Sequence, residues 1–295
     1  LVLLKKQAPI PRRRRYPLLP LRPRSLQRVA SLEVMWYGLF VVEEQFTPPV
    51  AILSGGGLTV LQAQLGEWDN LNHLLVCEKT SVACIVDPFS GEYWNDVCIK
   101  NGWELNLCIL THSHWDHTKG VEELLRVNPS CQIWLHENEA LRGWSGPDTD
   151  RWSHEQYSSV NFEIGALSFN IHLTPGHTPG HVSIIGNGVY ISGDCLFLGR
   201  CGRTDLFGGD LKSQYESLLY LKSVLRKLPN NWLVLPGHQY LLADGSTPTT
   251  STIEELLKNN LALIGIETWD NFKKLHFLSF DDNLAEKARR QRAQN

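Results

Sequence analysis

Three histidines and one aspartate fall within six consecutive residues, from His112 to His117, directly after the apolar run 105–110. His112 and His114 are two positions apart, so an extended backbone directs both side chains to one face. Asp116 and His117 follow where the chain turns into a predicted helix. Imidazoles and carboxylates are the ligands that zinc and similar ions take in catalytic sites. Because the chain has only 11 histidines in 295 residues, this cluster indicates a metal site rather than a solvated loop.

Three further predicted strands are followed by a residue that can bind a metal. A single Asp or His at a strand end is usually a cap or a turn residue. Four such strand ends favour a shared site, because layered α/β folds place their ligands at the carboxyl ends of strands. The additional candidates are His177 in a Pro- and Gly-rich turn after strand 167–173, Asp194 after strand 189–191, and His238 after strand 232–235.

The complete series resembles the ligand set of the metallo-β-lactamase superfamily in order and spacing. It reads His112-x-His114-x-Asp116-His117, then His177, Asp194 and His238. Within that superfamily the chain is most similar to hydroxyacylglutathione hydrolase (glyoxalase II) and its relatives, including the persulfide dioxygenases. Segments 68–75, 85–88 and 192–197 carry this resemblance, which extends over about residues 58–260. β-Lactamases of the most studied type are less similar, since they have Cys where this chain has Asp194.

The resemblance implies an α/β fold, a four-layer αβ/βα sandwich in which two sheets pack together and helices cover the outside. The hydrophobic periodicity agrees with this architecture. It predicts strands at 36–42, 73–77, 82–86, 105–110, 131–135, 167–173, 182–185, 189–191 and 232–235, and helices at 92–101, 120–127, 210–228, 252–263, 269–276 and 283–292.

The sequence also predicts how the chain is divided. We expect a catalytic domain at residues 58–245, a lead-in segment at 35–57 and a C-terminal helical segment at 246–295. Residues 1–34 contain nine basic residues and one acidic residue. They are expected to be a disordered extension, either transit-like or an untranslated stretch upstream of the single methionine. The expected location is intracellular and cytoplasmic, or organellar if the extension is a transit peptide.

Charge and cysteine usage exclude several classes of partner. Residues 35–295 carry 19 basic and 30 acidic residues, a net charge of −11 compared with −3 for the whole chain. This acidic body argues against a nucleic-acid partner. No apolar run approaches the roughly 20 residues that span a bilayer, so no membrane partner is expected. Seven cysteines without a C-x-x-C pair argue against a disulfide framework and a thiolate zinc site. The oligomeric state is left open.

The resemblance assigns roles to the metal-binding residues. Two divalent ions are expected, zinc first, with iron and manganese as alternatives. Such ions lower the pKa of water to about 7, so a bridging hydroxide would attack a thioester carbonyl while Asp116 orients it. Asp87, after strand 82–86, is either an acceptor for a ligand histidine or a turn residue. In the implied arrangement His112, His114 and His177 hold one ion, Asp116, His117 and His238 hold the other, and Asp194 bridges them.

Arg203 is the candidate substrate-binding residue, because its guanidinium could pair with a carboxylate of a glutathione conjugate, the expected small-molecule substrate. The competing interpretation is a surface arginine bonded to Asp205 or Asp210. Hydroxyacylglutathione hydrolases usually have an aromatic pair after such a basic residue, whereas this chain has Thr204 and Asp205. The sequence Gly-Arg-Thr-Asp resembles instead the persulfide dioxygenases and short bacterial glyoxalase II-like proteins.

Three functions are therefore carried forward. The first is a metal-dependent hydrolase that cleaves a glutathione thioester. The second is a persulfide dioxygenase with one iron held by His112, His177 and Asp194. The third is another hydrolase of this fold, a lactonase or a β-lactamase. The continuation Thr-Pro-Gly-His at 178–181 favours the first. His181 is expected to be more tolerant of replacement than His112 or His177, because the alternation after the turn fits a strand start as well as a site residue.

Overall fold

The computed structural model describes residues 47–278, and the statements below concern those residues. The extension 1–34, the predicted strand 36–42 and the predicted helix 283–292 lie outside them. No described helix is both long enough and apolar enough to pass through a membrane.

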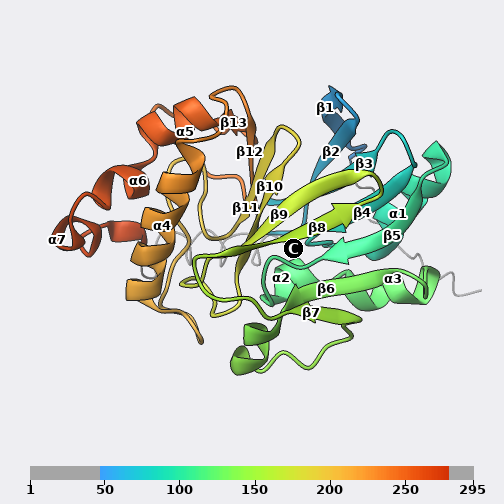
Figure 1. Cartoon of the computed structure of the whole chain (residues 1–295), viewed down its shortest axis with the longest axis horizontal. Coiled ribbons are helices and arrows are strands. Elements are labelled where there is room, and N and C mark those ends of the chain that lie inside the picture. Colours follow the sequence, from blue (N-terminus) through green and yellow to red (C-terminus); the bar gives the residue numbers. More distant parts are fainter. Residues whose placement is uncertain (1–46, 279–295) are drawn as a thin grey trace, which may run out of the picture. The chain divides into compact units, whose positions relative to one another are not determined.

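The first sheet has seven strands in the spatial order β1 to β7 (Figure 1). Strands β1 to β4 are antiparallel neighbours, and β4 to β7 are parallel neighbours. Parallel strands need crossover connections, which α1 supplies between β4 and β5, and α2 and α3 supply between β5 and β6. The elements are β1 Val50–Gly55, β2 Leu58–Leu65, β3 Asn70–Cys77, β4 Val82–Val86, α1 Gly91–Asn101, β5 Glu104–Ile109, α2 Trp115–Thr118, α3 Val121–Val127, β6 Gln132–His136, the 3-10 helix η1 Glu137–Arg142 and β7 Asp150–Trp152.

The second sheet has six strands in the order β13-β12-β11-β10-β9-β8. Its neighbours are antiparallel except β11 and β12, which are parallel and joined through α4. The elements are β8 Ser159–Ile164, β9 Leu167–Leu173, β10 Val182–Gly186, β11 Val189–Gly193, α4 Leu211–Leu225, β12 Leu233–Pro236, β13 Ser251–Thr252, α5 Ile253–Asn259, α6 Leu261–Gly265, α7 Trp269–Phe272 and the 3-10 helix η2 His276–Leu278.

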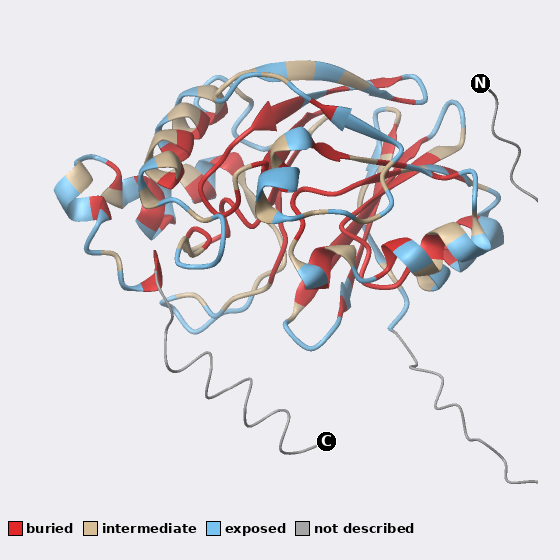
Figure 2. Cartoon of the chain, turned by 90° about the horizontal axis from the view of Figure 1, so that it is seen from below, coloured by how far each residue is buried: buried red, intermediate tan, exposed pale blue. Residues whose placement is uncertain are grey.

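Three apolar clusters define four layers. The central cluster joins the facing sides of the two sheets, for example Leu75 of β3 with Ile171 of β9. A second cluster packs α1 and α3 on the outer side of the first sheet, and a third packs α4 to α7 on the second. Figure 2 shows buried residues concentrated in the strands and exposed residues on the helices. The expected αβ/βα sandwich is confirmed.

Most predicted elements are present with ends shifted by a few residues. The predicted helix 252–263 is divided at Asn260, whose side chain accepts from the N–H groups of Ala262 and Leu263 and so starts a new helix. Five strands were not predicted. Strand β1 is largely exposed and lies within the segment 35–57, and β13 has only two residues and lies after residue 245. The other three are β2, β7 and β8.

All seven cysteines are free and buried, as expected.

Several buried histidines outside the ligand loops predict acid sensitivity. Burial lowers the pKa of His73 to about 3 and that of His172 to about 4. Their unfolded-state value is about 6.5, so between pH 6.5 and 4 the unfolded chain binds protons that the folded chain does not. We expect the free energy of unfolding to fall as pH decreases through this window, by up to about 1.4 kcal/mol per pH unit for each such histidine.

Urea unfolding of the metal-depleted chain from pH 7.5 to 4.5 checks this expectation. The variant H73Q, which cannot bind the proton, should show a shallower pH dependence than the native chain. Equal slopes for both proteins would contradict the assignment.

Candidate metal centre

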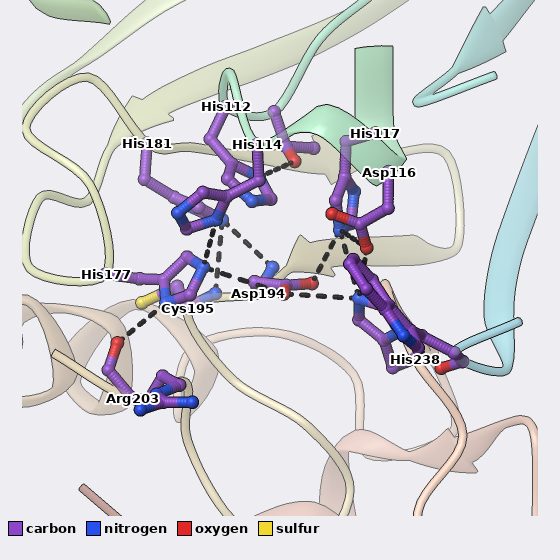
Figure 3. Close-up of polar contacts among 12 residues, drawn as sticks. His112, His114, Asp116, His117, His177, His181, Asp194, Cys195, Arg203 and His238 are labelled. Atoms are coloured by element: carbon purple, nitrogen blue, oxygen red, sulfur yellow. Dashed lines mark hydrogen bonds and ion pairs between the residues drawn. The ribbon is translucent and has the colours of Figure 1, made fainter. Parts of the chain in front are cut away.

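Four loops meet at one end of the two sheets, and each begins where a strand ends. The loop after β5 brings His112 to His117, and the loop after β9 brings His177. Asp194 follows β11 directly, and His238 follows β12. The structure thus brings all seven predicted metal-binding side chains together (Figure 3). All are buried except His114, which is partly exposed.

One group consists of three imidazoles, His112, His114 and His177. Their ligand atoms lie within 4.8 Å of one another. His177 Nε2 is 2.8 Å from His114 Nδ1, so these two nitrogens point at the same volume. Three nitrogen donors that leave room for a fourth ligand are typical of catalytic rather than structural zinc sites.

A second group consists of Asp116, His117 and His238. His238 Nε2 lies 3.1 Å from His117 Nε2 and 3.2 Å from Asp116 Oδ2, and His117 Nε2 lies 3.4 Å from the same oxygen. Ligands about 2.0–2.1 Å from a tetrahedral zinc are separated by about 3.3 Å. The distances in this group are therefore those of atoms around one small cation.

Asp194 lies between the two groups. Its Oδ1 is 3.4 Å from His117 Nε2, while its Oδ2 is 3.3 Å from His238 Nε2 and 3.6 Å from His177 Nε2. Gly237 allows this approach, since a Cβ at that position would be 2.3 Å from Asp194 Oδ1. A single carboxylate consequently faces both groups at once.

Two atoms of the cluster fit a cation better than a hydrogen-bond network. His112 Nε2 and Asp194 Oδ1 are buried without a hydrogen-bond partner among the described residues. Buried polar atoms of proteins are nearly always paired, because an unpaired one costs about 1–3 kcal/mol. An unpaired nitrogen and an unpaired carboxylate oxygen in this position are what a divalent ion would satisfy.

The family comparison agrees with this donor set. The sequence model described as "Metallo-beta-lactamase superfamily" matches residues 72–238, which contain every ligand candidate.

The chain belongs to the metallo-beta-lactamase superfamily.

Several members of this superfamily are similar to the chain in sequence or structure. The hydroxyacylglutathione hydrolase of Alkalilimnicola ehrlichii is 35% identical over 176 residues, which are 60% of this chain and 64% of that protein. This chain therefore spans less than two thirds of that relative's length. The crystal structure of ETHE1 from Myxococcus xanthus is 25% identical in sequence, with a TM-score of 0.58. The match covers 79% of this chain and 97% of the ETHE1 chain. TTHA1623, solved in a di-iron-bound form, is 26% identical with a TM-score of 0.53, covering 68% and 98%.

Asp87 orients two of the candidate ligand histidines. Its Oδ2 accepts a hydrogen bond from His117 Nδ1 at 2.9 Å and another from the Thr111 hydroxyl at 2.6 Å. Because that hydroxyl proton is given to Asp87, Thr111 Oγ1 accepts from His112 Nδ1 at 3.0 Å. Both imidazoles therefore use Nδ1 as the outer donor and turn Nε2 inward, where it can bind a cation. Of the two interpretations of Asp87, the structure supports the acceptor.

Other ligands are held by main-chain and amide groups that the sequence analysis did not identify. His177 Nδ1 donates to the carbonyl of Arg203 at 2.7 Å, and His238 Nδ1 donates to the carbonyl of Trp68 at 2.8 Å. Asn70 Nδ2 donates to Asp116 Oδ2 at 2.8 Å. Main-chain acceptors leave no signal in residue types, so only the structure could reveal the first two.

Glu139, on η1, joins two of the ligand loops and was also missed. Its carboxylate accepts from the N–H and the hydroxyl of Ser113 in the first histidine loop. It also accepts from the N–H of Gly180, three residues after His177, at 2.8 Å. A fully buried carboxylate with these three donors fixes the two loops relative to each other.

Electrostatics distinguish the two groups. Burial lowers the pKa of His112 well below its ordinary value, and the neighbouring His117 and His114 add to this effect. Burial likewise lowers the pKa of His114 and of His177. These three imidazoles are therefore neutral at physiological pH, the form that binds metals.

In the second group the pKa values of the histidines are raised instead of lowered. Burial lowers the pKa of His117, but the carboxylates of Asp194, Asp116 and Asp87 outweigh it and raise the value to about 10. His238 is likewise raised well above its ordinary value by Asp194 and Asp116, although burial opposes this. In the metal-free chain these imidazoles hold protons, which a bound cation displaces.

Asp87, His112 and His117 form a third cluster of metal-capable atoms. The contacts already described exclude it as a separate site. Both oxygens of Asp87 accept hydrogen bonds, since Oδ1 takes the N–H of Thr111 at 2.7 Å in addition to the two donors at Oδ2. This carboxylate supports the ligands rather than holding an ion.

Two candidate residues behave differently from the metal-binding set. The guanidinium of Arg203 forms a two-pronged ion pair with Asp205, at 2.5 and 2.6 Å, which is the competing interpretation given above. His181 is fully buried and both of its ring nitrogens are hydrogen-bonded. The structure thus argues against the expectation that His181 tolerates replacement.

Asp87 provides a test of how the ligands are oriented. We expect D87N to weaken metal binding by ten- to a hundredfold, because an amide has one acceptor oxygen: it cannot serve His117 and the Thr111 hydroxyl at one position and the Thr111 N–H at the other. Metal titration of the chelator-treated chain measures this. D96N, the same exchange at an exposed position of α1, should bind metal like the native chain, and equal affinity of D87N would refute the role of Asp87.

Proposed function

We propose that the protein is a metal-dependent hydrolase that cleaves a glutathione thioester. Two complete ligand groups with one carboxylate between them carry this proposal. The hydroxyacylglutathione hydrolase relative supports the choice of substrate class. The acidic body of the chain is consistent with a small-molecule substrate rather than a nucleic acid.

In this proposal, the first ion is bound by His112, His114 and His177, the second by Asp116, His117 and His238, and Asp194 is the shared ligand. Nitrogen and oxygen donors in tetrahedral spacing favour zinc. Iron and manganese accept the same donors, and the di-iron form of TTHA1623 supports both a pair of ions and iron as an alternative.

Hydrolysis of a thioester adds water across the C–S bond. Two divalent ions would supply a water of lowered pKa and polarise the carbonyl oxygen. Asn70 holds Asp116 Oδ2, so the direction of this carboxylate is fixed and it can orient the attacking water. The new C–O bond forms as the C–S bond breaks, and the proton of the water goes to the departing thiolate. The products are a carboxylic acid and a thiol.

A persulfide dioxygenase is the second candidate. The sequence Gly-Arg-Thr-Asp at 202–205 favours this candidate. The structural similarity to ETHE1 also supports it, but less strongly than the similarity to hydroxyacylglutathione hydrolases supports the hydrolase. That reaction would use one iron held by His112, His177 and Asp194, whose facing atoms include a pair 3.6 Å apart.

Metal content and substrate choice distinguish the two candidates. We expect two divalent ions per chain by elemental analysis, and faster hydrolysis of S-lactoylglutathione than oxygen uptake with glutathione persulfide. H112A and H238A should each bind less metal and lose at least 99% of the hydrolysis rate, since each removes a ligand. If the protein binds one iron per chain and takes up oxygen only with the persulfide, the hydrolase proposal is wrong and the protein is a persulfide dioxygenase.

Arg203 remains our proposed contact for a substrate carboxylate. We expect R203A to raise KM by about ten- to a hundredfold with little change in kcat, which corresponds to a lost charged hydrogen bond of about 1.5–3 kcal/mol. D205N is the matched control, because it removes the charge of the Asp205 partner and should not raise KM. If both variants keep the native KM, the Arg203–Asp205 pair is a structural ion pair only.

A further inference from the structure

His181 is the one histidine near the centre that belongs to neither ligand group. It is fully buried, and its ring lies 5.4 Å from that of His112 and 6.4 Å from that of His177. Its Nε2 faces two main-chain N–H groups, of Asp194 at 3.0 Å and of Cys195 at 3.1 Å (Figure 3). The other ring nitrogen, Nδ1, lies 3.1 Å from Thr174 Oγ1.

These contacts fix the state of the ring. A main-chain N–H can only donate, so Nε2 must be the unprotonated acceptor for both groups. The proton of the neutral ring is then on Nδ1, which donates to Thr174 Oγ1. Thr174 is itself buried, at the end of β9, and Ser183 Oγ lies 3.2 Å from its hydroxyl. His181 therefore donates a hydrogen bond to Thr174 from Nδ1. Its Nε2 accepts hydrogen bonds from the main-chain N–H groups of residues 194 and 195.

The segment 193–195, to which His181 is hydrogen-bonded, forms a tight turn. Gly193 has φ +48°, and a Cβ there would lie 2.7 Å from His181 Nε2 and 2.6 Å from Thr111 Oγ1. Gly237 N–H donates to the Gly193 carbonyl at 3.0 Å, and Gln214 Nε2 donates to the Cys195 carbonyl at 2.7 Å. These two bonds fix the carbonyls on either side of Asp194, whereas His181 fixes the N–H groups.

We propose that His181 is a positioning residue for Asp194: by accepting both N–H groups it aims that carboxylate at the space between the two ligand groups. Asp194 is the only proposed ligand shared by both ions, so a small rotation of its backbone would change two sites together. A side chain that packed well but accepted nothing would leave the buried N–H of Asp194 unpaired, and the N–H of Cys195 would keep only its longer bond to the Ser192 carbonyl at 3.3 Å. This inference rests on the proposed metal-binding role of Asp194.

The experiment compares replacements that differ in where they place an acceptor. A glutamine oxygen lies as many bonds from Cβ as His Nε2, whereas an asparagine oxygen reaches only the position of Nδ1. We expect H181Q to retain the native behaviour, and H181N and H181L to lose it. The full-length chain is depleted of metal with a chelator and titrated with Mn²⁺. Bound ion is counted, and spin coupling between paired ions is recorded by electron paramagnetic resonance.

We expect two ions and a coupled spectrum for the native chain and for H181Q. H181N and H181L should bind Mn²⁺ ten- to a hundredfold more weakly and lose the coupled spectrum. Native affinity and coupling in H181N or H181L would overturn the proposal. If H181L fails to fold by circular dichroism, the comparison of H181N with H181Q still decides. T174V, which keeps His181 but removes the acceptor of its Nδ1 proton, should weaken binding severalfold, and native binding by T174V would argue against the proposal.

A failure of the proposed function gives a different pattern. If the native chain binds a single ion, the two-ion hydrolase is wrong, but Asp194 is a ligand in the one-ion alternative as well. H181N should then still bind that ion more weakly than H181Q. If D194N binds metal like the native chain, Asp194 is no ligand and the inference about His181 is wrong.

Discussion

The fold is organised around the problem of burying five imidazoles and two carboxylates within a few ångströms of one another. Burial disfavours the charged forms of all these groups, and inward-facing lone pairs repel each other unless protons or a cation lie between them. The opposite pKa shifts of His112 and His117 show both responses in one centre. In the metal-free chain the imidazoles of the first group remain neutral, while those of the second hold an extra proton against their carboxylates. Each response is only possible because surrounding acceptors determine which nitrogen of each ring faces inward.

Those acceptors come from distant parts of the chain, which is why the sandwich is needed. His117 and His112 depend on Asp87 at the end of β4, His177 on the carbonyl of Arg203, and His238 on the carbonyl of Trp68. Glu139 ties the loop after β5 to the loop after β9, across the boundary between the two sheets. A loop displaced by even 1 Å would lose these bonds, so the packing of the two sheets determines the geometry of the ligands.

The sequence predicted which side chains converge better than it predicted the groups that hold them, for a physical reason. Metal-binding side chains come from a few residue types, mainly His, Asp, Glu and Cys, and strand ends follow from hydrophobic periodicity. The candidates could therefore be found by residue type: His112 to His117, His177, Asp194 and His238. Supports are defined by geometry instead. A carbonyl such as that of Trp68 has no residue preference, and His181 was judged replaceable because periodicity does not show what its ring contacts. Similarly, β1 is exposed and β13 has two residues, so neither produces a hydrophobic pattern that could be recognised.

The charge balance of the centre follows from the same residues and bears on the chemistry. Of the proposed ligands only Asp116 and Asp194 are anionic, and neutral imidazoles supply the remaining five. Two divalent ions facing two carboxylates would keep a net positive charge in a buried site, where electrostatic interactions are weakly screened. An anion that develops on a carbonyl oxygen during acyl transfer would be stabilised there more than the neutral substrate is. A centre in which carboxylates replaced His112 or His177 would bind cations more tightly but lose this advantage. The excess of imidazole over carboxylate therefore favours hydrolysis over simple metal storage.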